Sequence, residues 1–224
     1  MSNTVAQLLA AGNVAEVFEW GSRVVKLYRS PAAKQAAFRE VANHTAVEAM
    51  GLPVPAVWGV QRIGARWGIV FDRVKYAPLA EQMRGDPTAM SHYLETLAAL
   101  QARIHAQPAS QFSSLKLRLA ANIARVNVLD EPRKRVLLTR LADPEGDRLC
   151  HGDFHPINVL GEVSPVVIDW PDACRGDPVV EAACGRHCRA LPRSVLPHQQ
   201  CNVGEAPRLA ALGCSGETCR RYPG

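Results

Sequence analysis

The sequence has 224 residues, a hydrophobic fraction of 47% and a formal net charge of +5. This composition is typical of a globular chain, for which disorder is not the default expectation, and the length suits one domain or two small lobes that share a cleft. Residues 1–11 contain neither a basic start nor a long apolar run. We therefore expect no secretory signal, no membrane span and a cytoplasmic protein.

The positive charge is concentrated after residue 183. Residues 184–224 hold six arginines and two glutamates, which accounts for +4 of the +5 and leaves +1 for residues 1–183. No basic stripe interleaved with aromatic residues occurs in that larger part, so we expect no nucleic-acid binding. Five of the seven cysteines also lie after residue 183, and this odd total does not indicate the disulfide framework of a secreted protein.

The first part of the chain reads as sheet, helix, sheet. Ser30-Pro31 is a helix start and Gly51 a helix stop, with an Ala-rich segment between them. Gly21-Ser22 suits a two-residue hairpin turn, and residues 63–65 a second turn. Alternating apolar patterns predict strands in residues 6–11, 15–20, 23–28, 56–61 and 66–71.

A helical region follows. Asp86-Pro87 begins a periodic helix whose apolar face carries Met90, Tyr93, Leu94, Leu97, Leu100 and Ile104. Further helical patterns cover residues 114–128 and 133–141, and short strand patterns cover 158–160 and 166–168. We therefore predict an N-terminal lobe in 1–74, a mostly helical lobe in 75–183 and a separate tail in 184–224.

The tail departs from the rest of the sequence in its cysteines, its arginines and its lack of a sustained period. Two interpretations are equally open: a segment read in a shifted frame or from a truncated gene, and a natural disordered tail. Either way we expect it to remain loose, because it can bury little apolar area to offset its ordering cost. Cys184 and Cys188 with His187 have half of a zinc-site pattern, which is too weak to support a prediction.

The candidate chemistry is concentrated in the run His151-Gly152-Asp153-Phe154-His155-Pro156-Ile157-Asn158 and in Asp169. Transfer of a γ-phosphoryl group needs a base near the acceptor hydroxyl, divalent metal on the phosphates and a positioning cation. Asp153 would be the base. Asn158 and Asp169 would offer oxygen ligands to Mg²⁺.

These two motifs, H-G-D-F-H-P-I-N and V-I-D-W, together resemble the aminoglycoside phosphotransferase and choline kinase family, distant relatives of protein kinases. Gly176-Asp177-Pro178 resembles the same family. The resemblance implies an α+β protein-kinase-like two-lobed fold, with a small antiparallel-sheet lobe and a shortened helical lobe, and ATP and Mg²⁺ between them. It also implies a small-molecule hydroxyl as acceptor, a bracing role for His151 and a turn shaped by His155.

The N-terminal part agrees with this interpretation. Lys26, on the strand before the first helix, would hold the α- and β-phosphates, and Glu40 on that helix would pair with it. Residues 69–74 resemble the hinge that receives adenine, which makes Asp72 and Val74 candidate nucleotide contacts. The phosphate loop at Gly12 has one glycine where G-x-G-x-x-G would have three, which leaves the nucleotide affinity open.

Two rival functions stay open. His151, Asp153 and His155 alternate as H-x-D-x-H, a spacing also found in metal-dependent phosphohydrolases. A catalytically impaired pseudokinase or truncated fragment is the second rival, because the resembling family continues with further helices after the metal aspartate. If the tail cannot replace those helices, apolar surface is exposed and stability or activity is lost.

Overall fold

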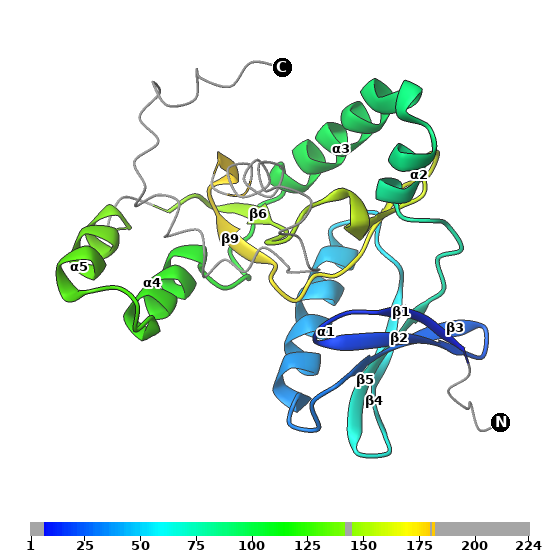
Figure 1. The fold of residues 1–224 in the computed structure, drawn as a ribbon, viewed down its shortest axis with the longest axis horizontal. Helices are drawn as coiled ribbons and strands as arrows, with labels where there is room; N and C mark the ends of the chain where they lie inside the picture. Colours follow the sequence, from blue (N-terminus) through cyan, green and yellow to red (C-terminus); the bar gives the residue numbers. More distant parts are fainter. Residues whose placement is uncertain (1–6, 142–144, 180, 182–224) are drawn as a thin grey trace.

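The computed structural model describes residues 7–141, 145–179 and 181. The expectation of a loose tail in 184–224 lies outside these residues. Figure 1 shows a sheet with one helix against it, joined to a helical region that contains two further short sheets. The fold is thus α+β, as the sequence predicts.

The N-terminal sheet has five antiparallel strands in the order β1-β2-β3-β5-β4. Gly21, with φ of 63°, occupies the hairpin turn between β2 and β3, which confirms the predicted turn. β3 pairs with β5 so that Lys26 is opposite Ile69. The strands are β1 (Leu8–Ala11), β2 (Ala15–Trp20), β3 (Arg23–Tyr28), β4 (Val57–Ile63) and β5 (Arg66–Asp72).

One helix, α1 (Lys34–Ala49), packs against this sheet. Its predicted start at Ser30-Pro31 is three residues too early. The Oγ of Ser30 accepts the Ala32 N–H at 3.2 Å, so Ser30 closes a local turn and does not cap the helix. The predicted end is right, since Gly51 has a φ of 71° directly after the last turn.

The helical region begins with a helix that the sequence patterns did not predict, α2 (Leu79–Gly85), whose seven residues are too few to show a period. The Asp86 side chain then accepts the Thr88 N–H and caps a short 3₁₀ turn before α3 (Met90–His105). One of the six residues predicted to form the apolar face of α3, Leu94, is exposed and not packed in the core. α4 (Leu115–Arg125), capped by Ser114, and α5 (Glu131–Arg140), capped by Asp130, form a helical pair at one side of the molecule.

Two short antiparallel pairs hold the segment that contains the candidate motifs. β6 pairs with β9, which places Cys150 opposite Cys174, and β7 pairs with β8. The β6–β9 pair was not predicted, because three-residue strands have no readable period. The strands are β6 (Arg148–Cys150), β7 (Val159–Leu160), β8 (Val166–Val167) and β9 (Cys174–Gly176), with a 3₁₀ turn at Pro156–Asn158.

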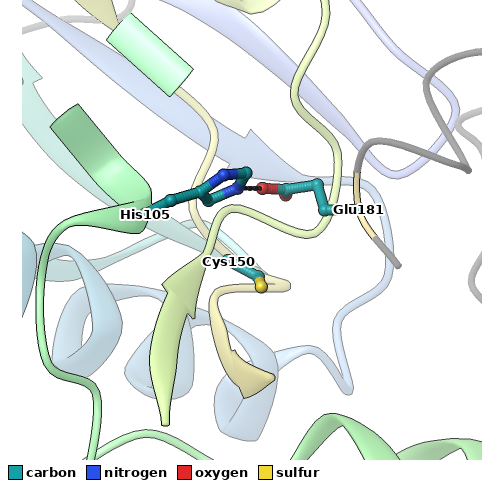
Figure 2. A group of neighbouring side chains, drawn as sticks. All are labelled: His105, Cys150 and Glu181. Atoms are coloured by element: carbon teal, nitrogen blue, oxygen red, sulfur yellow. Dashed lines mark hydrogen bonds and ion pairs between the residues drawn. The ribbon is translucent and has the colours of Figure 1, made fainter. Parts of the chain in front are cut away.

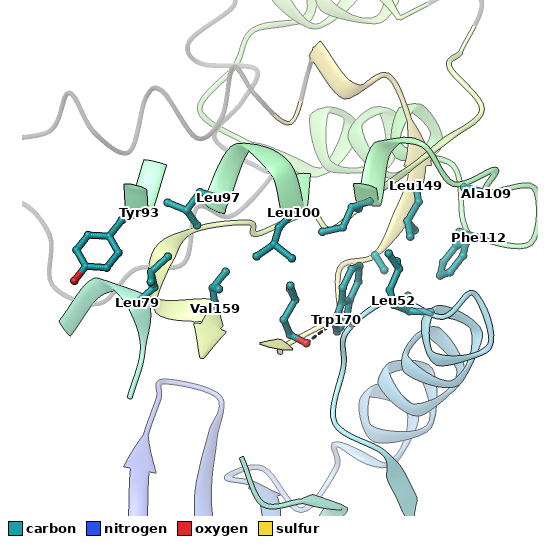
Figure 3. Packing of buried hydrophobic residues seen from close by; sticks show 14 residues of the cluster. Leu52, Leu79, Tyr93, Leu97, Leu100, Ala109, Phe112, Leu149, Val159 and Trp170 are labelled. Atoms are coloured by element: carbon teal, nitrogen blue, oxygen red, sulfur yellow. Dashed lines mark hydrogen bonds between the residues drawn. The ribbon is translucent and has the colours of Figure 1, made fainter. Parts of the chain in front are cut away.

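The main hydrophobic core lies beneath this segment and joins it to α2, α3 and the end of α1 (Figure 3). Trp170 is fully buried there, and its Nε1 donates to the carbonyl of Val167 at 3.2 Å. Trp170 therefore packs the loop beside Asp169 against the core. Its burial ties the position of Asp169 to the core.

Candidate active site

A cleft of about 1310 Å³ lies between the N-terminal sheet and the helical region. Its walls come from the β1–β2 loop, β3, α1, the segment after β5, α3 and the loops on either side of β7 and β8. Of the predicted site residues, His151 does not line it. The others do: Gly12, Lys26, Glu40, Asp72, Val74, Asp153, His155, Asn158 and Asp169.

The ammonium of Lys26 is held between two carboxylates inside the cleft. Its Nζ lies 2.8 Å from Oε1 of Glu40 and 2.5 Å from Oδ1 of Asp169. Glu40 is 1% exposed and also accepts a short hydrogen bond from the Tyr28 hydroxyl. Because Lys26 and Tyr28 are two positions apart on β3, both side chains project from the same face of the sheet toward α1.

This network fixes the ionisation of its members. Burial alone would lower the pKa of Lys26, but the nearby charges of Glu40 and Asp169 outweigh it and raise that pKa above its usual range. Burial alone would raise the pKa of Asp169, but the Lys26 ammonium lowers it. Lys26 therefore stays cationic and Asp169 anionic at neutral pH.

Asp153 and Asn158 face each other across the loop of residues 151–158. The Asn158 Nδ2 donates to the Asp153 carbonyl at 3.0 Å, so the Oδ1 of the same amide points away from Asp153. His155 lies 3.4 Å from Oδ2 of Asp153, and its Nδ1 accepts the Ile157 N–H at 3.2 Å. His155 thus begins the 3₁₀ turn that presents Asn158.

His151 is fully buried and joins this loop to the strand before Asp169. Its Nδ1 accepts the Asp153 N–H at 3.2 Å, which leaves Nε2 to donate to the Ile168 carbonyl at 3.0 Å. The ring packs on Trp170, with ring centroids 4.3 Å apart. Both ring nitrogens are therefore used within the protein. The H-x-D-x-H run does not form a metal-binding strand face, and the phosphohydrolase interpretation loses its ligand set.

Two residues at this site have left-handed backbone conformations. Gly152 has a φ of 88°, and an added Cβ would lie 2.4 Å from the Asp172 carbonyl oxygen. Asp169 has a φ of 69°, and it is the one residue other than glycine with a positive φ in the described part of the chain. Such a conformation is uncommon for a residue with a Cβ and concentrates at functional sites.

Where the β1–β2 loop borders the cleft, it is a tight turn in which the Gly12 N–H donates to the Ala15 carbonyl at 2.9 Å. The Arg29 Nε donates to the Gly12 carbonyl, also at 2.9 Å. Two hydrogen-bonding groups of Asp72 already have partners. Its N–H donates to the Ala56 carbonyl, and its Oδ1 accepts from Trp58 Nε1. Neither this N–H nor this carboxylate oxygen is therefore available for a contact with adenine.

Sequence reasoning did not identify three residues that support the site. Tyr28 binds Glu40, and its position two residues after Lys26 on β3 could have predicted that both side chains lie on one face of the sheet. Asn43 donates from α1 to the carbonyls of Trp170 and Pro171, each at 3.2 Å. Glu181 accepts the Gly152 N–H at 2.5 Å. Nothing in the sequence alone distinguishes Asn43 or Glu181 from an ordinary polar helix position.

A five-stranded antiparallel sheet with one helix, joined across this cleft to a helical region, defines a kinase-like α+β fold. Comparison with known proteins agrees. The model of the phosphotransferase enzyme family matches residues 8–200, and the chain belongs to this family. The resemblance stated from the sequence is thereby confirmed. No curated protein gives a significant match.

Several solved structures share the fold at low sequence identity. Aminoglycoside phosphotransferase APH(4)-Ia is 23% identical, with 93% of this chain and 78% of that chain covered and a TM-score of 0.60. Aminoglycoside-3'-phosphotransferase of type VIII is 21% identical, with coverages of 96% and 88% and a TM-score of 0.58. APH(3'')-Id from Streptomyces rimosus ATCC10970 is 20% identical, with coverages of 91% and 83% and a TM-score of 0.59.

Other structures of these relatives contain ligands. APH(4)-Ia variants were solved with ADP and hygromycin B and with AMP-PNP and hygromycin B, and APH(3'')-Id with ADP and streptomycin. No helix in the described part of this chain has the length and apolar character needed to cross a membrane.

Proposed function

We propose that the chain transfers the γ-phosphoryl group of ATP to a hydroxyl of a small molecule, of the aminoglycoside, choline or related amino-alcohol and sugar-like kind. The observation that carries the proposal is the meeting of Lys26, Glu40 and Asp169 in one cleft with Asp153 and Asn158. Phosphoryl transfer requires of a protein a cation that positions the phosphates, an anion that binds the metal ion and a base for the acceptor hydroxyl.

Each residue has a role that its surroundings support. Lys26 would hold the α- and β-phosphates, and Glu40, itself fixed by Tyr28, would hold the ammonium in place. Asp153 would orient the acceptor hydroxyl and accept its proton. His151 would keep the 151–158 loop in register with the strand that ends at Asp169, through its two hydrogen bonds.

The donor set fits Mg²⁺. Asp169 offers a carboxylate and Asn158 an amide oxygen that points away from Asp153, and Mg²⁺ prefers such hard oxygen ligands together with phosphate oxygens and water. When bound, the ion would neutralise negative charge on the β- and γ-phosphates. Asn158 and Asp169 would hold it.

Nucleotide titration tests the proposal. Wild type should bind ATP more tightly with Mg²⁺ than without it, and Asp169→Ala should lose that dependence. Equal Mg²⁺-dependent affinity in the two proteins would refute the metal assignment. Phosphoryl transfer should then be measured over a panel of aminoglycosides, choline and ethanolamine. Tight Mg²⁺-dependent ATP binding without turnover across the panel is the result that the pseudokinase interpretation predicts.

A further inference from the structure

A histidine, a cysteine and a glutamate meet behind the 151–158 loop. His105 ends α3, Cys150 ends β6, and Glu181 follows β9. One donor atom from each residue lies within 4.8 Å of the other two. Figure 2 shows the imidazole of His105 facing the Glu181 carboxylate, with the Cys150 side chain beside them. Within residues 7–141, 145–179 and 181, no other group of three His, Cys, Asp or Glu side chains has this spacing.

The cluster is buried but adjoins the cleft. Cys150 is 1% exposed and Glu181 is 7% exposed, while His105 is partly buried. Cys150 and Glu181 both line the cleft described above, so an ion in the cleft can reach them. None of the three side chains has a direct role in the proposed phosphoryl transfer, and Glu181 supports the 151–158 loop only through the Gly152 N–H. The meeting of His105, Cys150 and the second Glu181 oxygen has no role in that proposal.

We propose that Nε2 of His105, Sγ of Cys150 and a carboxylate oxygen of Glu181 bind one Zn²⁺ or a similar divalent transition-metal ion. Nitrogen, thiolate and carboxylate are the ligand types of zinc sites, and three protein ligands leave one position for water. A thiolate and a carboxylate together neutralise a divalent cation, which suits a buried site. Mg²⁺ does not suit it, because that ion prefers oxygen ligands.

The geometry requires only small movements. Zinc bonds of about 2.0 to 2.3 Å in tetrahedral arrangement put neighbouring ligand atoms about 3.3 to 3.8 Å apart. His105 Nε2 and Glu181 Oε2 are now 2.7 Å apart and would separate slightly. The other pairs lie within 4.8 Å and would approach by at most about 1.5 Å.

A hydrogen bond from the backbone also orients the Glu181 carboxylate. Its Oε1 accepts the Gly152 N–H at 2.5 Å, so the carboxylate is oriented with Oε2 toward His105. Hydrogen bonds of this kind to a ligating carboxylate orient metal ligands. A bound metal would therefore tie α3, β6 and the segment after β9 to the residue that precedes Asp153. The proposal does not depend on phosphotransferase activity.

Cobalt substitution distinguishes this site from a simple ion pair between His105 and Glu181. Because the five cysteines after residue 183 are competing ligands, they are first replaced by serine in the full-length chain. Co²⁺ is then titrated with excess Mg²⁺ present. We expect one equivalent to bind with a thiolate-to-cobalt charge-transfer band in the near ultraviolet, and Zn²⁺ to displace it. Absence of the band would overturn the proposal.

Variants assign the ligands. Cys150→Ser should abolish the charge-transfer band, and Cys174→Ser should keep it, since Cys174 is equally buried and faces Cys150 across the β6–β9 pair but is not one of the three ligands. His105→Gln keeps an N–H donor for Glu181 without a ligand nitrogen, and should weaken Co²⁺ binding about 10-fold or more. A band that survives in Cys150→Ser, or wild-type affinity in His105→Gln, would refute the assignment.

Discussion

The Nζ of Lys26 lies 2.5 Å from Oδ1 of Asp169, although the two residues are 143 positions apart in the sequence. This ion pair joins β3 of the N-terminal sheet to the loop after β8, across the cleft. Because Glu40 is held by the same ammonium, one cation organises both a buried and a half-buried carboxylate. The cation thus has a structural role as well as the proposed phosphate-binding role, and the two can be separated.

Lys26→Met should abolish Mg²⁺-ATP turnover and also destabilise the fold. The substitution leaves the charge of Glu40 buried without its partner, and breaking a buried pair in this way costs about 3 to 5 kcal/mol. The double variant Lys26→Met with Glu40→Gln should recover at least half of that loss, because a neutral amide can still bind the Tyr28 hydroxyl. Turnover should stay absent. Urea unfolding and ATP consumption measure the two effects.

Lys34→Met is the control for this pair. Lys34 is an exposed lysine on α1 that contacts the Trp67 ring, so its loss should change the free energy of unfolding by less than about 1 kcal/mol. Equal destabilisation by Lys26→Met and Lys34→Met would show that the Lys26 network does not stabilise the fold.

Asp153→Asn should leave ATP binding unchanged and slow transfer to an accepted hydroxyl by about 10²- to 10⁴-fold. The variant preserves the size of the side chain and removes only the proton acceptor. The His151 and Asn158 hydrogen bonds to the Asp153 backbone are not affected. Single-turnover kinetics with saturating ATP provide the measurement, and unchanged turnover would rule out Asp153 as the base.

Much of the fold and of the candidate site could be predicted from the sequence because local and long-range patterns agree. The 151–158 motif, Asp169 and the order of Lys26 and Glu40 all indicate one chemistry, and the alternating strands predict the sheet that carries Lys26. The start of α1 was misplaced because Ser30 forms a turn with Ala32, a choice that residue type does not reveal. The β6–β9 pair and Glu181 were missed because their partners are set by tertiary packing and not by a sequence period.

Stability should fall as the pH drops below about 6.5, in part because of His44. This ring is 1% exposed, packs on Phe71 and contacts the Pro55 carbonyl at 2.6 Å. Burial lowers its pKa, against the opposing effects of the hydrogen bond to the Pro55 carbonyl and the charges of Glu40 and Glu48, while Lys26 adds to the lowering. A lowered pKa means that the unfolded chain takes up the proton first. The stabilisation is thus present above the unfolded pKa and lost as the pH falls toward the folded one.

His44→Gln tests this contribution, since glutamine can donate to Pro55 but does not titrate. The free energy of unfolding in urea should be measured at several values between pH 7.5 and 5.5. Wild type should lose up to about 1.4 kcal/mol per pH unit more than the variant in the part of this range below the unfolded pKa. Parallel profiles for the two proteins would show that His44 has the same pKa in the folded and unfolded states.

Gly152→Ala should be among the most damaging small substitutions in the chain. An alanine Cβ there would lie 2.4 Å from the Asp172 carbonyl oxygen and 2.8 Å from the Asp172 Cβ, and the backbone has a φ of 88°. Close backbone contact and a left-handed conformation together should cost about 2 to 5 kcal/mol. The shift needed to relieve the contact would also move Asp153, so turnover should fall more than ATP affinity.

Gly64→Ala separates the effect of the left-handed backbone conformation from the effect of the close contact. Gly64 has a similar conformation, with a φ of 60°, but a Cβ there meets nothing within 4 Å. It should therefore cost only the conformational part, about 1 kcal/mol, and leave turnover unchanged. Chemical denaturation and steady-state kinetics of both variants give the comparison. If Gly152→Ala were no more destabilising than Gly64→Ala, the 151–158 loop would be able to move away from Asp172 at little cost, contrary to the close contact in the structure. Gly152 would then be required for its backbone conformation alone.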